Sequence, residues 1–153
     1  MCWPLTMPMA EAEKYKSQLN DAIAKAGGTW NRQFALMRHA AVYDSEDDRT
    51  AALSAIRNVL GKFGNLMMKK GEVINGFPQQ VPFEELQGNV RVDPDMLEEN
   101  LVFGTPDTVV RKIKQYQDIG VDAFIYYASM GLDMDVQKRS LQSFIDHVMP
   151  EFA

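Results

Sequence analysis

Hydrophobic residues recur with a helical period in four stretches of the chain. In each stretch they stand three or four positions apart, which is the spacing of one face of a helix. The intervening positions are mostly polar or charged. The pattern predicts helices over residues 9–26, 49–69, 106–119 and 134–148. In the last of these we expect Val136, Leu141, Phe144, Ile145 and Val148 to be buried, and in the second Leu53, Ile56, Leu60, Phe63 and Met67.

Two further stretches are apolar at nearly every position. Residues 34–43 and 121–128 are short and rich in aromatic and aliphatic side chains. Strands that are apolar on both faces are typical of parallel sheets covered by helices on both sides. Residues 1–6 predict one more short strand, which contains Pro4 and runs into a loop at Pro8.

The helix over residues 106–119 has clear signals at both ends. Thr105 can cap its first turn with the side-chain hydroxyl, and Pro106 stands at the first helical position, where a missing N–H costs nothing. Gly120 supplies the left-handed residue that commonly ends a helix. A buried strand follows within two residues, so this stretch predicts an α/β unit.

Residues 71–100 differ from the rest of the chain. They contain several glycines and prolines and only short apolar clusters. Because a compact domain seldom holds thirty residues without regular structure, we expect a lid, with a turn or two of helix at 82–86 and 94–100.

The elements alternate as strand, helix, strand, helix, lid, helix, strand and helix. This order predicts one domain over residues 1–153, with parallel strands joined by right-handed crossovers. Three strands leave both sheet edges open, which a closed (β/α)8 barrel would avoid. Such a barrel needs about 250 residues, so we expect the chain, which starts within a strand, to be part of a longer barrel protein.

Composition narrows the classes of function. The chain has 153 residues, of which 46% are hydrophobic and 24% charged, with a formal net charge of −5. We therefore expect no nucleic-acid partner, since that needs a basic surface, and no membrane span, since no apolar run is long enough. With Cys2 as its single cysteine, the chain lacks a disulfide framework, and a cytoplasmic location is the default. No metal site is predicted.

Three ordered pieces of the chain resemble one family. Residues 104–107 (Gly-Thr-Pro-Asp), the helix after them and residues 120–125 resemble the closing signature of the luciferase-like flavin-dependent monooxygenases. The helix that ends at Pro150 is similar to the last helix of that family, and residues 38–48 to the strand and helix before its lid. The family fold is a (β/α)8 barrel, so the resemblance implies that this chain holds about three C-terminal β/α units.

The resemblance also implies a chemistry. Members of the family use reduced flavin, normally FMN, and dioxygen to oxidise a small organic substrate, and some use a deazaflavin instead. A flavin reductase is the implied source of reduced flavin, and a homo-oligomer such as a dimer is the implied assembly. The phosphate-binding loops of the family lie earlier in the barrel, and Gly27 and Gly28 are better explained as a helix stop. We therefore expect the chain alone to be inactive.

Three residues are candidates for flavin contact, by their strands in the resemblance. These are Trp3, His39 and Tyr127. Each has a plain structural alternative: Trp3 and Tyr127 can be core residues, and His39 can hold a structural hydrogen bond, for instance with Asp122.

Five residues are candidates for substrate or lid contacts. Arg38 and Tyr126 each precede a flavin candidate in the same strand, so each pair points to opposite faces and one member of it can enter the barrel. Arg38, like His39, can instead hold a structural ion pair or hydrogen bond, and Tyr126, like Tyr127, can be a core residue. Ser129, Met130 and Phe77 are candidates by position, in the loop after the last strand and in the lid. His147 is expected at the surface.

A second class of function stays open from the same features. A partial barrel with two open sheet edges can be a non-catalytic module that pairs or self-associates through those edges. Flavin binding and the state of association separate the two hypotheses.

Overall fold

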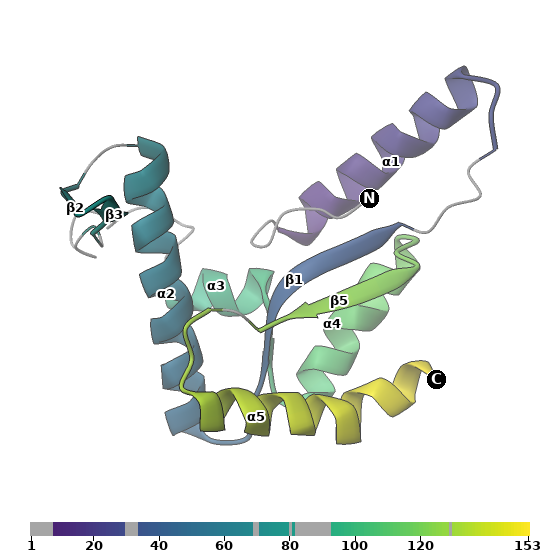
Figure 1. The fold of residues 1–153 in the computed structure, drawn as a ribbon. Coiled ribbons are helices and arrows are strands. Elements are labelled where there is room, and N and C mark those ends of the chain that lie inside the picture. Colours follow the sequence, from purple (N-terminus) through teal and green to yellow (C-terminus); the bar gives the residue numbers. More distant parts are fainter. Residues whose placement is uncertain (1–7, 30–33, 69–70, 80, 82–92, 129) are drawn as a thin grey trace.

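The chain folds as an α/β domain with helices on both faces of a parallel sheet (Figure 1). The computed structural model describes residues 8–29, 34–68, 71–79, 81, 93–128 and 130–153. Its elements in chain order are α1 (Met9–Lys25), β1 (Ala35–Val42), α2 (Glu46–Met68), β2 (Val73–Ile74), β3 (Phe77–Pro78), α3 (Pro94–Asn100), β4 (Val102–Gly104), α4 (Pro106–Asp118), β5 (Ala123–Tyr127) and α5 (Met134–Ser143), after which a π-helical turn η3 (Phe144–Val148) and a 3-10 turn η4 (Met149–Phe152) follow.

The first strand of the main sheet lies at its centre. The order is β4-β1-β5, and both pairs are parallel. The first half of β1 pairs with β5, from Ala35 opposite Ala123 to His39 opposite Tyr127. Its second half pairs with β4, from Ala40 opposite Val102 onwards. The expected parallel α/β architecture is confirmed.

Each face of the sheet has its own hydrophobic core. One core joins alternate residues of β1 to α1, α4 and η3: Ala12, Phe34, Leu36, Ala40, Val42, Val102, Val109, Ile113, Tyr116, Val121, Phe144 and Val148. The other joins the remaining face to α2 and α3: Ala41, Tyr43, Ala52, Leu53, Ala55, Ile56, Leu97, Leu101, Phe103 and Met130. The connections from β1 to β4 and from β4 to β5 run in opposite directions and use helices on opposite faces, as crossovers of one hand must.

This strand order differs from that of successive strands in a barrel. A (β/α)8 barrel places each strand beside the next one in the chain, so β4 would lie between β1 and β5. Here β1 occupies that position and pairs with both. The order is that of a doubly wound sheet, in which the chain returns across its first strand.

The predicted ends of α4 are largely confirmed. Thr105 is the N-cap residue, Pro106 opens the helix and Gly120 adopts a φ of 87° after it. The Thr105 hydroxyl, however, bonds the Thr108 hydroxyl at 3.2 Å and caps no backbone N–H. Gly104 is required just before, at a φ of 146°, because a Cβ there would come within 2.7 Å of Thr108 Cγ2.

Two short elements were not predicted. β4 has three residues, too few for a periodic pattern to show. The hairpin of β2 and β3 turns through Asn75 and Gly76, both at positive φ, and this Asn-Gly pair is a recognised two-residue hairpin signal. Figure 1 shows the hairpin beside the end of α2 that lies farthest from α5. The helix predicted at 94–100 is confirmed, whereas those residues expected to form a strand at 1–6 and a turn of helix at 82–86 lie outside the described part of the chain.

Three predictions of burial were wrong. Phe63 is 54% exposed, and Leu141 and Ile145 are 42% and 43% exposed. In α2 the first half packs on the sheet, and α2 then extends past it towards the hairpin (Figure 1). In α5 and η3 the sheet covers Phe144 and Val148 but not the neighbouring face. None of the helices in the described ranges is long and apolar enough to cross a membrane.

Candidate functional site

The sheet topology singles out one end of the sheet, where the carboxyl ends of β1 and β5 lie. The helix that follows β1 packs on one face of the sheet, and the helix that follows β5 packs on the other. Where the helices after adjacent parallel strands diverge in this way, a crevice forms outside the strand ends, and ligands of open α/β sheets bind there. This end of the sheet is therefore the expected place for a ligand-binding site.

The two helices that begin at this end of the sheet, α2 and α5, are capped and are joined to each other. Ser45 Oγ accepts a hydrogen bond from Asp48 N at 3.1 Å, and Asp133 Oδ1 accepts one from Asp135 N at 2.9 Å. Between the two helices, Arg139 Nη2 of α5 donates to Asp48 Oδ1 of α2 at 2.6 Å. Hydrogen bonding to the Arg139 guanidinium lowers the pKa of the Asp48 carboxyl. The two helix starts are thus held in fixed relation beside the strand ends.

His39 and Tyr127 lie together on the α2 face, one on each of the paired strands. Their ring centroids are 4.9 Å apart, with an interplanar angle of 53°. His39 is 2% exposed, and within the described part of the chain its Nδ1 has no hydrogen-bond partner. Burial lowers the pKa of His39 from 6.5 to about 4, so the imidazole is neutral near pH 7. His39 is thus a buried neutral imidazole that packs against the Tyr127 ring, and its Nδ1 is closed to solvent in this arrangement.

Arg38 and Tyr126 lie on the opposite face, against α4 and α5. Arg38 Nε donates to the Tyr116 hydroxyl at 3.2 Å, and its guanidinium lies 5.4 Å from the centre of that ring. The Tyr126 hydroxyl is 2.8 Å from Ser140 Oγ, and that oxygen also accepts from Val42 N at 2.7 Å. The expected opposition of neighbouring residues is confirmed, and this face holds structural contacts.

Asp122 has a different hydrogen-bond partner from the one that we expected. Asp122 Oδ2 accepts from the backbone N–H of Phe34 at 2.7 Å. It thereby fastens the start of β1 to the start of β5, and Arg38 uses Tyr116 in its place.

The remaining candidates are not gathered at one point. Met130 is 1% exposed within the core on the α2 face, and Phe77 is 72% exposed on the hairpin, away from the strand ends (Figure 1). Trp3 and Ser129 lie outside the described residues. The structure therefore brings His39 and Tyr127 together and leaves Phe77 apart from them.

A polar network that the sequence did not indicate follows β1 directly. The Tyr43 hydroxyl donates to Glu98 Oε1, and Arg49 holds the same carboxylate with Nε at 3.0 Å and Nη2 at 2.7 Å. Hydrogen bonding to Arg49 lowers the pKa of Glu98, and burial beside this carboxylate raises the pKa of Tyr43. The position of Tyr43 just after a buried strand was the available signal, but nothing local pointed to its partner on α3.

Lys112 fastens the same helix from the other side. Its Nζ donates to the backbone carbonyls of Glu98, Leu101 and Phe103, the last two at 2.8 and 3.0 Å. Burial lowers the pKa of Lys112 to about 8. With its hydrogens directed at three carbonyls, Lys112 fixes α3 and β4 to α4.

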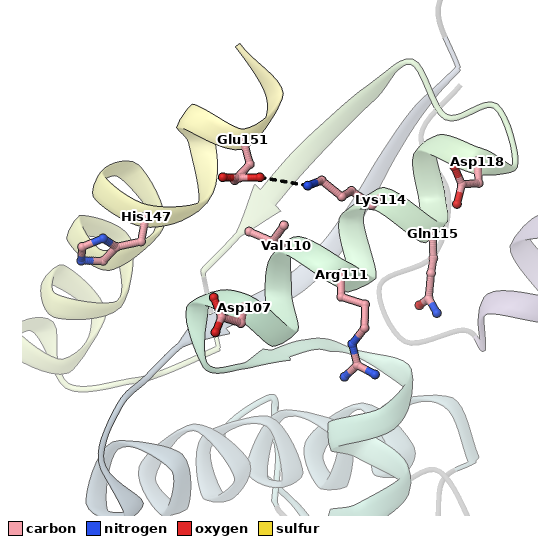
Figure 2. A pocket seen from close by; sticks show the side chains of 8 residues that line it. All are labelled: Asp107, Val110, Arg111, Lys114, Gln115, Asp118, His147 and Glu151. Carbon is pink, nitrogen blue, oxygen red and sulfur yellow. Dashed lines mark hydrogen bonds and ion pairs between the residues drawn. The ribbon is translucent and has the colours of Figure 1, made fainter.

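A separate groove of about 450 Å³ runs between α4 and the C-terminal turns (Figure 2). Figure 2 shows Lys114 reaching across it to Glu151, at 2.9 Å, with Arg111, Asp107 and His147 around it. His147 is exposed, as expected. The lining mixes both signs of charge and contains none of the predicted site residues, which is typical of a solvated helix surface.

Comparison with known proteins gives one informative likeness. The chain is 27% identical over 150 residues to the oxygenase component of a flavin-dependent trigonelline monooxygenase from Acinetobacter baylyi. The alignment covers 98% of this chain and 42% of that protein, so the chain spans less than half the length of the relative. No family model matches. The chain is a distant homologue of a flavin-dependent monooxygenase component, and the likeness does not single out the luciferase-like family.

Proposed function

We propose that the chain forms part of the flavin and substrate site of a flavin-dependent monooxygenase of the luciferase-like kind. The observation that carries the proposal is the likeness to a flavin-dependent oxygenase component along nearly the whole chain. The contact between the His39 and Tyr127 rings supports it, since both residues are candidates for flavin contact by the resemblance.

One residue present, Tyr127, fits the ring system of a flavin, because its half-buried ring can pack against a flat heteroaromatic surface. The neighbouring His39 Nδ1 is buried and would reach a polar ring edge only after the side chains that cover it had moved. Arg38 and Tyr126 hold the opposite side of the same strands rigid through Tyr116 and Ser140. The flavin, when bound in reduced form, would supply the activation of dioxygen.

The finer features of the proposal follow from the resemblance. The cofactor would be FMN, with a deazaflavin as the alternative, and the substrate a small organic molecule. A separate flavin reductase would be the partner, because the relative is named an oxygenase component. Trp3 and Ser129 would complete the site, and residues 71–100 would form its lid. The protein would be cytoplasmic. The chain alone would not turn over.

In this proposal the chain is a C-terminal portion of a (β/α)8 barrel within an enzyme that assembles as a homo-oligomer. Closure of such a barrel would need β4 to move between β1 and β5, because β1 now pairs with both. A β4–β5 contact in the full-length parent would thus support a barrel.

Titration with FMN, followed by the quenching of flavin fluorescence, tests the cofactor assignment. Replacing Tyr127 with Leu should weaken FMN binding by up to about tenfold, the scale of a lost aromatic contact. The matched control is Tyr126→Phe, which alters the neighbouring residue on the opposite face and should leave FMN binding unchanged. Absence of FMN binding by both this chain and its full-length parent would refute the proposal.

A second candidate function is a module that pairs through its open sheet edges. β5 is an edge strand of five apolar or aromatic residues, and none of them is fully buried, with Ile125 40% exposed. Apolar edge strands favour pairing with another strand. Hydrogen exchange of the β5 amides can detect such pairing. Protection of these amides that increases with protein concentration, in a chain that does not bind flavin, would favour this candidate.

A further inference from the structure

The hairpin of β2 and β3 lies beside α2 with its apolar side chains in solvent (Figure 1). Residues 71–77 are all exposed, including Val73 (63%), Ile74 (51%) and Phe77 (72%). A two-stranded hairpin is marginally stable by itself in water. Because the apolar residues of this hairpin bury little surface, we looked for a polar contact that holds it on the helix.

The side chain of Asn65, near the end of α2, bonds the base of the hairpin at three points. Its Nδ2 donates to the backbone carbonyls of Glu72 at 2.9 Å and Gln79 at 2.7 Å. Its Oδ1 accepts a hydrogen bond from Gly71 N at 2.8 Å. Glu72 and Gln79 stand on the two arms of the hairpin, and Gln79 N donates to Glu72 O at 2.9 Å. One amide therefore binds both arms.

The surroundings of Asn65 are shaped for this contact. The residue is 2% exposed, and both hydrogens of its amide nitrogen are used. A Cβ at position 71 would lie 2.8 Å from Asn65 Nδ2. Glycine at this position therefore gives the backbone the space to pass close to the amide.

A polar contact of this kind can open at low cost. When the hairpin lifts off α2, water replaces each of the three hydrogen bonds, so the net loss is a small part of their strength. Little apolar surface is uncovered, because the apolar side chains of the hairpin are exposed already. The two arms stay joined by the turn at Asn75 and Gly76, so they move together.

We propose that residues 71–79 form a strap that opens and closes as one unit, and that Asn65 is the latch that holds the strap closed on α2. The proposal does not depend on the oxygenase function, because its tests measure the position and the opening of the strap and not the binding of flavin.

The distance between two nitroxide spin labels, measured by double electron–electron resonance, tests the latch. In a Cys2→Ser background, the exposed positions Ser54 on α2 and Ile74 on the strap are changed to Cys and labelled. We expect one narrow distance distribution. Asn65→Asp keeps the shape of the side chain but turns a negative oxygen toward two carbonyls, so it should raise the open, broad fraction at least about tenfold. The matched control is Asn58→Asp, at an exposed position of the same helix, which should leave the distribution unchanged.

A second variant tests the latch from the side of the strap. Gly71→Ala places a Cβ against the Asn65 amide and should broaden the distribution as Asn65→Asp does. Far-UV circular dichroism and urea unfolding check that both variants keep the folded domain. A broad distribution in the wild-type chain would overturn the proposal. Distributions for Asn65→Asp and Gly71→Ala that are as narrow as that of the wild type would overturn it as well.

Hydrogen exchange in low concentrations of urea tests whether the strap opens separately from the domain. The reporters are the Gln79 amide, which is bonded within the strap, and the Val42 amide, which is bonded to Ser140 Oγ in the core. Relative to its intrinsic rate, the Gln79 amide should exchange at least about tenfold faster than that of Val42, at a rate that urea hardly changes, because the opening exposes little surface. Equal protection with equal urea dependence would mean that the strap opens only in global unfolding, and would overturn the proposal.

Discussion

The two faces of β1 and β5 differ in how completely they are satisfied. On the face toward α4 and α5, Arg38 meets Tyr116 and Tyr126 meets Ser140, within a continuous core. On the face toward α2, His39 Nδ1 has no partner in the described part of the chain, and Ile125 is 40% exposed. The same two strands supply both faces through alternate residues. Both faces hold a hydrophobic core, but the first pairs its polar side chains, whereas the second keeps a buried imidazole nitrogen without a partner in the described residues.

The largest expected effect comes from breaking the closed face. Phe144 is 9% exposed and packs its ring 4.7 Å from that of Tyr126. Phe144→Ala should lower the free energy of unfolding by about 3–5 kcal/mol, through lost burial and a cavity. Urea unfolding measures it. Ile145→Ala, one residue along and exposed, is the control and should change stability far less; equal losses would mean that this core is not centred on Phe144.

The second effect lies on the face toward α2 and depends on pH. The pKa of His39 is about 4 in the folded chain and about 6.5 when unfolded, so the unfolded state binds more protons between these values. Stability should fall as pH drops from 6.5 to 4, by up to about 3 kcal/mol from this residue. His39→Asn should remove that part of the pH dependence in urea titrations.

The control for this prediction is the exposed His147. His147→Asn should leave the slope of stability against pH unchanged. If His39→Asn and His147→Asn gave the same profile as wild type, burial of the His39 imidazole would not be costing stability.

A third effect separates two neighbouring serines. Ser140 Oγ accepts from Val42 N and bonds Tyr126, so Ser140→Ala strands a buried N–H and should cost about 1–3 kcal/mol. Ser143 Oγ is buried with no partner in the described ranges, so Ser143→Ala should be neutral or stabilising. Thermal melting of the two variants measures the difference. A larger loss of stability for Ser143→Ala than for Ser140→Ala would contradict the assignment of Ser140 as the link between β1 and α5.

The smallest effect tests the network at the carboxyl end of β1. Tyr43→Phe removes the bond to Glu98 while Arg49 still holds that carboxylate through two nitrogens. We expect a loss of about 1 kcal/mol, measured by chemical unfolding, because the carboxylate keeps its charged partner. A loss several times larger would show that Tyr43, and not Arg49, is what holds α3 against the sheet.

Local patterns were sufficient for most of the elements. The period of β1 and β5 predicted that Arg38 and His39, and likewise Tyr126 and Tyr127, face opposite ways, as the register confirms. The hairpin was missed although Asn75 and Gly76 carried its signal, and β4 was missed because three residues show no period.

The candidate site was predictable in part. His39 and Tyr127 were both named from their strands, but their contact depends on the pairing of residues that are 88 positions apart. Tyr43 was missed because its partner Glu98 lies 55 positions away on a helix whose place no local signal sets. The exposure of Leu141 and Ile145 was likewise unpredictable, because a helical period shows an apolar face but not how much of it a sheet covers.

The sequence by itself therefore determined the local structure of this protein: the helices with their stops at Gly27 and Gly120, the two apolar strands, and the opposite orientation of neighbouring strand residues. Backbone geometry and side-chain alternation act over a few residues, so a few residues suffice to show them. Only the tertiary structure decided that β1 lies between β4 and β5, that His39 meets Tyr127, and that Leu141 and Ile145 stay exposed. These features follow from how distant segments pack, and each segment alone is compatible with several arrangements.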